Sequence, residues 1–390
     1  MAQMMKLEDC ATIIAGQSPK SEYYNTDGNG LPFFQGKADF GELYPQIRVY
    51  CSEPIRIAEK DDILLSVRAP VGPTNLAPTK VCIGRGLSAI RPNKEIERKY
   101  LLLYFRYFEA QLSSKGTGTT FKAITQRTIR NLEIPVLPLE KQQRIVSRIE
   151  DLFSELDKGV ETLQTIKEQL AVYRQAVMKE AFEGSFKKCP LKEISTVISG
   201  YAFKSEKYTP AGDYTVVKIG NVKQGYFDFS KDLTRTNEFD CSILTKYLMK
   251  QGDCLITLTG SRGKRDYGFV AMISDEENFL LNQRVAALRF DRNVAIPKFY
   301  MYYLSSFDYR NQFFGYETGN VGQGNVGIKA LKEPLVVFPP IEIQRQIVKK
   351  IESRLSLCDS IEQTVDNLLA QAEAMRQSIL KKAFEGELCK

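Results

Sequence analysis

The sequence predicts a mixed α+β or α/β protein: two globular domains joined by two long helices that form an antiparallel coiled coil, with a pseudo-twofold internal repeat. The first observation is the repeat, because residues 138–184 and 340–386 align without a gap at a constant offset of 202. The copies share 18 of 47 positions, where average residue usage gives about 3. Both copies also have helical periodicity, and each follows a longer block of short β-like runs.

The repeat divides the 390 residues into four parts. We predict a first domain over residues 1–137, a first helix over 138–186, a second domain over 187–339 and a second helix over 340–390. This length suits two or three domains, and an apolar share of 43% is ordinary for folded domains.

The first block mixes β-like runs with turn residues. The runs are ILLSVRAPVG (63–72) and KVCIGRGLSAIRP (80–92), and an aromatic-rich helical stretch, KYLLLYFRYFEAQL, follows at 99–112. A polar loop, SSKGTGTTFKAIT, closes the block at 113–125. We expect the aromatic stretch to be core and the block to be an α/β domain.

The repeated segments each carry a narrow apolar stripe of heptad spacing. Each begins after a proline, Pro138 or Pro340, and ends at the glycine of AFEG, as helices commonly do. About 40 residues at 1.5 Å per residue give a helix of roughly 60 Å. Two equal stripes can cover each other, and a twofold-related duplication favours an antiparallel pair. The predicted core positions are Ile145, Ile149, Leu152, Leu156, Leu163, Leu170, Ile347, Ile351, Leu355, Val365, Leu368 and Ile379. The alternative is two surface helices, each packed on its own domain.

The second block has the same order of features. Its β-like runs include YTVVKIGNV, CLITLTG, FVAMI and QRVAALRF, its aromatic stretch spans 297–314, and its glycine-rich loop spans 316–331. The starts of the blocks also correspond at an offset of 184, where Gly16 pairs with Gly200 and Lys20 with Lys204. The two blocks are therefore diverged copies of one domain.

Charge and histidine content narrow the function. The net charge is +7, and the positive excess lies in the two blocks, with 18 basic and 14 acidic residues in 1–136 and 21 and 16 in 187–338. A polyanion is a reasonable partner, although a solvated basic surface gives the same balance. The absence of histidine excludes histidine general bases and the commonest zinc ligand. Eight scattered cysteines and the lack of a signal peptide or membrane-length apolar stretch lead us to expect a cytoplasmic protein.

Candidate contacts to nucleic acid lie in the loops and near the β-like runs. Backbone amides of the glycine-rich loops could approach phosphates, although neither loop is a P-loop, and arginine, lysine and amide side chains read base edges. Surface turns and solvated charge are the alternative interpretation. In the first block the candidates are Lys20, Arg68, Arg85, Lys115 and Lys122. In the second block they are Lys204, Arg262, Lys264, Arg265, Tyr267, Gln283, Arg284, Asn320, Gln323, Asn325 and Lys329.

The chain resembles the specificity subunit of type I restriction-modification systems. The resemblance is carried by P-L-E or P-I-E followed by Q-x-x-I-V-x-x-I-E at 138–150 and 340–352, and by the long helices ending in AFEG. It implies two target recognition domains, each reading one half of a bipartite, interrupted site in double-stranded DNA, with the coiled coil fixing the gap.

The resemblance also implies partners and the absence of catalysis. Two modification (methyltransferase) subunits would bind, most simply through the repeated helices, and restriction (endonuclease and translocase) subunits would join the full complex. S-adenosylmethionine, ATP and Mg would be bound by those subunits, and this chain would bind no cofactor or metal and have no catalytic residue. Consistent with this, the sequence lacks the N/D-P-P-Y/F motif of an amino-methyltransferase.

Two alternatives come from other functional classes. One is a coiled-coil scaffold or adaptor that does not read bases, which predicts neither a base preference nor a steep dependence of affinity on salt. The other is a nuclease with a carboxylate site built from Asp61, Asp62 or Asp253. Asp62 and Asp253 stand at corresponding strand starts, which turn chemistry also explains.

Overall fold

The computed structural model describes residues 3–116, 122–237, 239, 241–275, 278–319 and 322–388. The chain forms two compact units, unit 1 with Met1–Thr165 and Val365–Lys390, and unit 2 with Ile166–Thr364. Each unit contains one variable block and one half of each long helix. Within the described ranges, no helix has the length and apolar character needed to cross a membrane.

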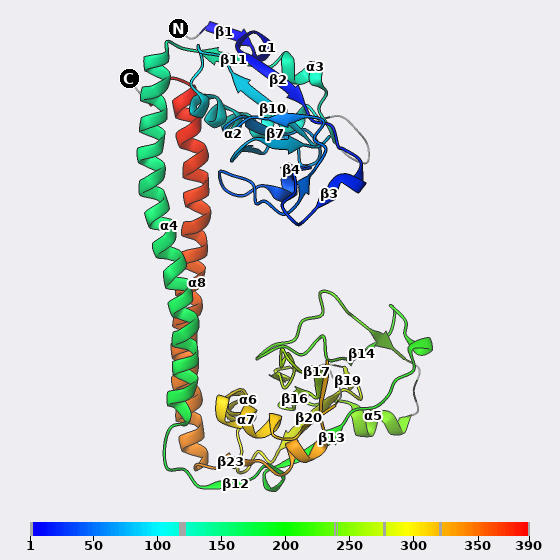
Figure 1. Ribbon diagram of the computed structural model, residues 1–390. Coiled ribbons are helices and arrows are strands. Elements are labelled where there is room, and N and C mark those ends of the chain that lie inside the picture. Colours follow the sequence, from blue (N-terminus) through cyan, green and yellow to red (C-terminus); the bar gives the residue numbers. More distant parts are fainter. Residues whose placement is uncertain are drawn as a thin grey trace. The chain divides into compact units, whose positions relative to one another are not determined.

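Unit 1 is built on two sheets (Figure 1). The four-stranded antiparallel sheet has the order β2 (Ala11–Ala15), β10 (Leu87–Pro92), β7 (Ile63–Ser66), β8 (Thr74–Leu76). The second sheet has the order β3 (Tyr24–Asn25), β5 (Tyr50–Cys51), β4 (Leu31–Phe34), β9 (Val81–Ile83), β6 (Ile57–Ala58), with β4 and β9 parallel. The two ends of the block pair with each other as β1 (Gln3–Lys6) and β11 (Glu133–Val136). The block is therefore closed on itself immediately before the first long helix.

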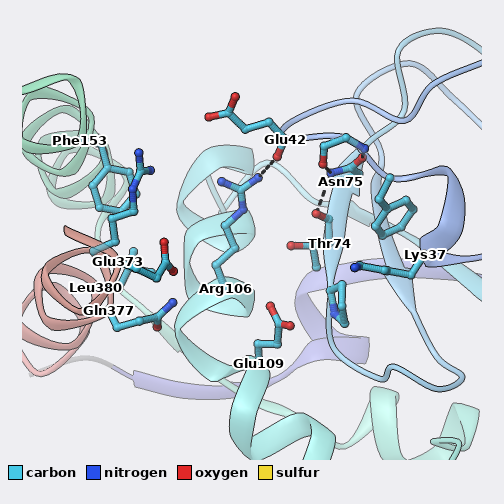
Figure 2. Close-up of a pocket in the computed structure, with 14 residues that line it drawn as sticks. Lys37, Glu42, Thr74, Asn75, Arg106, Glu109, Phe153, Glu373, Gln377 and Leu380 are labelled. Atoms are coloured by element: carbon cyan, nitrogen blue, oxygen red, sulfur yellow. Dashed lines mark hydrogen bonds between the residues drawn. The ribbon is translucent and has the colours of Figure 1, made fainter. Parts of the chain in front are cut away.

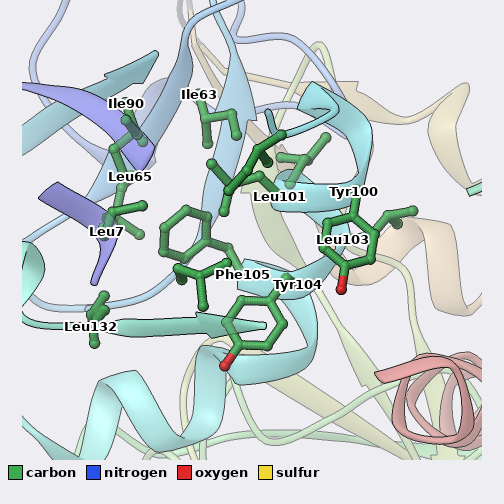
Figure 3. Close-up of a cluster of buried hydrophobic side chains, with 14 of the residues drawn as sticks. Leu7, Ile63, Leu65, Ile90, Tyr100, Leu101, Leu103, Tyr104, Phe105 and Leu132 are labelled. Atoms are coloured by element: carbon green, nitrogen blue, oxygen red, sulfur yellow. The ribbon is translucent and has the colours of Figure 1, made fainter. Parts of the chain in front are cut away.

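The core of unit 1 lies between the four-stranded sheet and helix α2 (Arg98–Ser114), as Figure 3 shows. Leu65 and Ile90 of the sheet pack with Leu101 and Phe105 of the helix, and all four are buried. The phenolic hydroxyl of Tyr100 donates a 2.9 Å hydrogen bond to the carbonyl of Pro135, which satisfies its polar end. The prediction that the aromatic stretch is core is confirmed. The short helices α1 (Leu7–Cys10) and α3 (Gln126–Arg130) complete the unit.

Unit 2 repeats this plan with additions. Its four-stranded sheet, with the order β13 (Ser195–Ser199), β20 (Val285–Phe290), β16 (Cys254–Thr257), β18 (Val270–Met272), corresponds strand by strand to that of unit 1. Its ends pair as β12 (Lys188–Pro190) and β23 (Leu335–Val337). Two small sheets have the orders β15 (Arg235–Thr236), β14 (Tyr214–Val217), β19 (Phe279–Leu281) and β17 (Thr259–Ser261), β22 (Gln323–Val326), β21 (Glu317–Thr318). The helices of this block are α5 (Cys241–Tyr247), α6 (Pro297–Leu304) and α7 (Phe307–Phe314).

The two repeated segments form the long helices α4 (Leu139–Phe182) and α8 (Ile341–Phe384), which pack antiparallel. Two ion pairs between them are the same contact made twice: Arg174 binds Asp359 at 2.7 Å in unit 2, and Arg376 binds Asp157 in unit 1. Each partner of one pair lies 202 residues from its counterpart in the other. The predicted antiparallel, pseudo-twofold pairing is confirmed. The helices also pack on the domains, because Ile145, Ile149 and Leu380 belong to the core of unit 1.

Most predicted coiled-coil positions are buried or half-buried, but Leu368 is an exception. Ile149, Ile351 and Val365 are at most 3% exposed, whereas Leu368 is 42% exposed. The two helices do not close on each other along the whole stripe, so some stripe residues border a gap between them. Leu368 instead lines an apolar groove of about 540 Å³ between α4 and α8 of unit 1. Its assignment to the core is therefore wrong.

A buried glutamine fixes the start of each long helix. The side-chain amide of Gln142 donates to the carbonyls of Glu95 (2.9 Å) and Leu137 (2.7 Å), and its oxygen accepts from the backbone N–H of Glu97 (2.8 Å). Gln344 makes the equivalent three bonds in unit 2, to Val294, Pro339 and Ile296. Both side chains are fully buried. Each glutamine thus joins its helix to the loop that precedes the aromatic helix of its own block.

Candidate nucleic-acid interface

Predicted basic residues of the first block converge where β7 ends in unit 1. Val67, the residue after β7, donates to the carbonyl of Gly86 at 2.9 Å and accepts from the N–H of Ile124 at 3.0 Å. Three adjacent backbone segments therefore carry Arg68, Arg85 and Lys122, and all three side chains are exposed. We call these three residues the basic corner. They are up to 54 positions apart in sequence, and only the strand pairing brings them together.

Lys115 lies beside the basic corner, but its ammonium group is near an aromatic ring. Gly116, the next residue, packs near the Lys122 side chain, and a Cβ added there would lie 3.3 Å from the Lys122 Cβ. The Lys115 ammonium stands 5.5 Å from the ring centroid of Phe108 on α2, which is a cation–π distance.

Unit 2 has the same arrangement of backbone in an extended form. Leu258, after β16, donates to the carbonyl of Arg284 at 3.0 Å and accepts from Val326 at 2.9 Å. The chain then continues as β17, which pairs with β22 so that Thr259 faces Asn325 and Ser261 faces Gln323. The turn after β17, residues 262–266, carries three exposed predicted side chains, those of Arg262, Lys264 and Arg265. We call β17, this turn and β22 the basic ribbon.

The exposed face of β22 is chemically suited to reading bases. Gln323 and Asn325 are exposed, while Gly324 and Val326 between and after them are buried, so the two amide side chains lie on the outer face. Amides both donate and accept hydrogen bonds, and the side chain of Asn or Gln can bind the N6 and N7 atoms of adenine in the major groove. Gln283 and Arg284, just before β20, are exposed as well.

Equivalent glycines, Gly16 after β2 and Gly200 after β13, let the chain pass close to the neighbouring backbone in each unit. Gly16 packs on the carbonyls of Gly84 and Leu87, and Gly200 packs on those of Asn282 and Val285, so closely that any Cβ would collide with backbone oxygen. The segments that follow carry Lys20 and Lys204. Each lysine is exposed and pairs with a neighbouring glutamate, at 3.4 Å to Glu22 and 3.8 Å to Glu206 respectively. Exposed pairs of this kind contribute little, so both lysines can exchange partners.

The remaining candidates have different outcomes. Tyr267 is fully buried, and its hydroxyl donates to the Glu317 carboxylate, so its assignment as a DNA contact is wrong. Its aromatic ring supports the basic ribbon from inside instead. Lys329 is exposed on the short helical turn Ile328–Leu331 after the ribbon. Asn320 lies outside the described residues, as do residues 117–121 of the first loop.

Both aspartates at corresponding strand starts have a structural role. Asp62 is buried and accepts two hydrogen bonds from Arg91, at 2.8 and 2.7 Å, and one from the N–H of Glu59. Asp253 makes the same contacts with Arg289 and the N–H of Lys250. Asp61 pairs with Arg98 at 2.6 Å. In the described part of the chain, no group of three or more Cys, Asp or Glu side chains could hold a metal ion. These carboxylates therefore give no support to the nuclease alternative.

A polar pocket of about 390 Å³ lies in unit 1 between α2, α8 and the β8 strand (Figure 2). Arg106 of α2 donates to the carbonyl of Glu42 at 2.7 Å, and burial lowers the pKa of this guanidinium. Burial raises the pKa of Glu109, one turn further along α2. Charges of both signs line the space, with Lys37 and Glu373 on opposite walls. None of the predicted DNA contacts lies in this pocket.

Sequence reasoning missed the residues that support the site. Arg310 and the glutamines Gln142 and Gln344 make three hydrogen bonds each, yet none was a candidate. A signal existed for each. Arg310 is the one basic residue in FDYRNQFF, and the glutamine at positions 142 and 344 is kept in both copies of the repeat.

Comparison with known proteins identifies the family. The model of the type I restriction modification DNA specificity domain matches residues 2–169 and again 183–371. The putative MjaX specificity subunit of Methanocaldococcus jannaschii is 40% identical over 176 residues, which cover 45% of this chain and 40% of that protein. The EcoKI specificity subunit of Escherichia coli is 26% identical over 332 residues, or 80% of this chain and 70% of that protein.

A solved structure is also similar. The HsdS subunit from Thermoanaerobacter tengcongensis is 48% identical where matched, with a TM-score of 0.37, over 39% of this chain and 37% of that one. The chain thus spans about 40% of the length of the MjaX and T. tengcongensis proteins. The family model, in contrast, covers most of both blocks and both helices. The chain belongs to the type I restriction modification DNA specificity family, and it carries the family's domain twice.

Proposed function

We propose that this chain is the DNA-binding specificity subunit of a type I restriction-modification complex. Each recognition domain, residues 1–137 and 187–339, reads one half of a bipartite, interrupted DNA site. The subunit thereby directs N6 methylation of adenine, or restriction, by its partner subunits in the cytoplasm. The observation that carries the proposal is that one backbone arrangement is built twice, around Val67 and around Leu258, with different exposed side chains on each copy. Two domains that recognise different half-sites are expected to share a backbone arrangement and to differ in the polar side chains that it exposes.

The partners follow from the same proposal. Two modification subunits dock on the α4 and α8 helices, which are alike in both halves of the molecule. The apolar groove of unit 1 supports this, because Leu368 and Met375 line it and are 42% and 53% exposed. Restriction subunits join the full complex, and S-adenosylmethionine, ATP and Mg²⁺ are bound by the partner subunits.

Co-expression with the cognate modification subunit is expected to produce N6-methyladenine in one interrupted motif. The reason is that two separate readers select two short sequences with unread base pairs between them. Sequencing that detects modified adenines, in a host without its own adenine methylation, measures the motif directly. A chain expressed without the modification subunit is the control. The absence of methylation, or a continuous motif, contradicts the proposed function, and a scaffold that does not read bases gives the first of these results.

Arg262→Ala, Arg265→Ala and Arg284→Ala are each expected to weaken DNA binding. An arginine that neutralises a phosphate contributes about 0.9 to the slope of log affinity against log salt, and one that reads a base contributes about 1–3 kcal/mol of discrimination. Fluorescence anisotropy with labelled duplex at several salt concentrations measures both. Arg345→Ala is the matched control, since Arg345 lies on α8, is 63% exposed and pairs with Glu342. If a variant kept both the wild-type affinity and the wild-type salt slope, the substituted arginine would not belong to the DNA interface.

A further inference from the structure

Arg310 of α7 holds the turn of the basic ribbon from behind. Its guanidinium donates to the carbonyls of Gly268 (2.8 Å), Tyr267 (3.2 Å) and Arg265 (3.3 Å), and so binds the segment that closes the turn 262–266. The same group lies 5.7 Å from the ring centroid of Phe269 and 5.1 Å from that of Phe314. Two rings and three carbonyls therefore fix its position.

The inner face of the basic ribbon is shaped for one tyrosine ring. Gly260 of β17 and Gly324 of β22 face each other in the strand register, and Tyr267 packs on both. A Cβ at Gly260 would lie 2.8 Å from Cδ1 of Tyr267, and one at Gly324 would collide with the hydroxyl. The hydroxyl donates to Glu317 of β21, whose second oxygen accepts from Nε of Arg262 at 3.3 Å. Tyr267 thus contacts both strands of the basic ribbon and is linked through Glu317 to Arg262.

The turn itself is closed by its own side chains. Asp266 accepts from the backbone N–H of Ser261 at 2.6 Å and from its hydroxyl at 3.1 Å, and these hydrogen bonds lower the pKa of the Asp266 carboxyl. Arg265 adopts a left-handed conformation, with φ of 47°, which an arginine rarely adopts without support. The Arg310 bond to the Arg265 carbonyl stands next to this strained position.

Arg310 differs from the ribbon arginines in its accessibility. Burial, and the charge of nearby Arg265, lower the pKa of Arg310, and its donors are directed to backbone carbonyls. The Arg265 guanidinium also lies near the Phe314 ring, 4.9 Å from its centroid, but Arg265 is exposed. A guanidinium that is surrounded by rings and carbonyls is poorly placed to bind phosphate, whereas one at the surface is well placed.

We propose that Arg310 is a positioning residue for base reading by unit 2: it fixes the turn 262–266 through three backbone carbonyls and makes no contact with DNA. The inference rests on the proposed function. It assigns the specificity of the second half-site to a turn that is ordered before DNA arrives, so that binding does not have to order it. Arg262 and Arg265 contact the DNA, and Arg310 determines where they stand.

The test uses the full chain in complex with its modification subunits and three duplexes. The first duplex carries the motif that the co-expression experiment identifies. In the second duplex the half-site of unit 1 is scrambled, and in the third the half-site of unit 2 is scrambled. Arg310→Met keeps the aliphatic stem, and Arg310→Lys keeps the charge but cannot reach three carbonyls at once. Arg292→Met is the control for lost charge, because Arg292 is exposed and follows the end of β20 opposite to Arg284. We expect Arg310→Met and Arg310→Lys to lower affinity for the intact motif about 10-fold or more, since each tenfold corresponds to one lost charge-assisted bond.

Discrimination and salt dependence separate the possible outcomes. Affinity for the duplex with the scrambled unit 2 half-site is expected to change by less than about twofold, and the salt slope is expected to change by much less than the amount of about 0.9 that one phosphate contact contributes. A lower slope with equal losses on all duplexes would mean that Arg310 binds phosphate, and unchanged discrimination would mean that it positions nothing; either overturns the inference. If the wild-type complex itself does not distinguish the duplexes, the proposed function fails first.

If Arg310→Met folds poorly, hydrogen exchange of the Arg310→Lys variant still tests the inference. In Arg310→Lys, amides of residues 262–268 are expected to exchange faster while amides of β16 and β20 keep their protection. Uniform loss of protection across unit 2 would show that Arg310 supports the whole domain rather than the turn, and it would overturn the inference.

Discussion

Replacing residues 1–137 with the corresponding block of another specificity subunit is expected to change one half of the methylated motif completely and to leave the other half unchanged. The physical reason is that the two ends of this block pair with each other, so the block folds as a closed domain. The block begins and ends as paired strands, β1 and β11, directly before α4, so its sheets and polar surface are complete without unit 2. The motif of the hybrid, determined by sequencing of modified adenines, gives the result.

The replacement has to preserve the contacts of the block with the helices. Lys99 pairs with Glu150 at 2.5 Å, and the Tyr100 and Tyr104 rings both pack on Phe384 of α8, at centroid distances of 5.3 Å. A donor block with equivalent residues at these positions is the suitable choice, and a hybrid with only residues 139–182 replaced is the control, because both half-sites should then survive. A hybrid block that changes both halves of the motif would contradict modular reading.

Gln142→Leu is expected to destabilise unit 1 by about 3 kcal/mol, since each buried polar group left without a partner costs about 1–3 kcal/mol. Leucine has nearly the same volume but leaves the N–H of Glu97 and the carbonyls of Glu95 and Leu137 without their bonds. Gln344→Leu is expected to have the same effect in unit 2. Denaturant unfolding with a probe in each unit measures both.

The neighbouring glutamine provides a matched control. Gln143 is exposed on the same helical turn, so Gln143→Leu should change stability by less than about 0.5 kcal/mol. If Gln142→Leu behaved like Gln143→Leu, the buried amide would not be what joins the helix to its block.

The helices could be predicted from the sequence because their signals are local. Pro138 and Pro340 precede the first helical residues, Leu139 and Ile341, and the apolar stripe repeats along the chain itself. Leu368 shows the limit of this reasoning, because a heptad pattern gives the spacing of the stripe but not the twist of the helices that decides which side chains meet.

The candidate interface was only partly predictable because its geometry is non-local. Arg68, Arg85 and Lys122 are ordinary exposed residues in sequence, and hydrogen bonds through Val67 bring their segments together. Tyr267 stands among basic residues in RGKRDYG, which suggested a surface position. Its burial depends on two distant glycines, Gly260 and Gly324, that leave room for a ring only once β17 and β22 have paired.

The paired contacts Arg174–Asp359 and Arg376–Asp157 have a consequence for the history of the molecule. Since Asp359 is the counterpart of Asp157, a chain consisting of residues 1–186 alone would present Arg174 to Asp157 of an identical copy, twice over. Such a half-length protein is expected to form a self-complementary dimer, and with the proposed function that dimer would recognise a palindrome. Fusion of two genes for such a protein would have released the two readers to diverge, and with them the requirement that both halves of the target be the same.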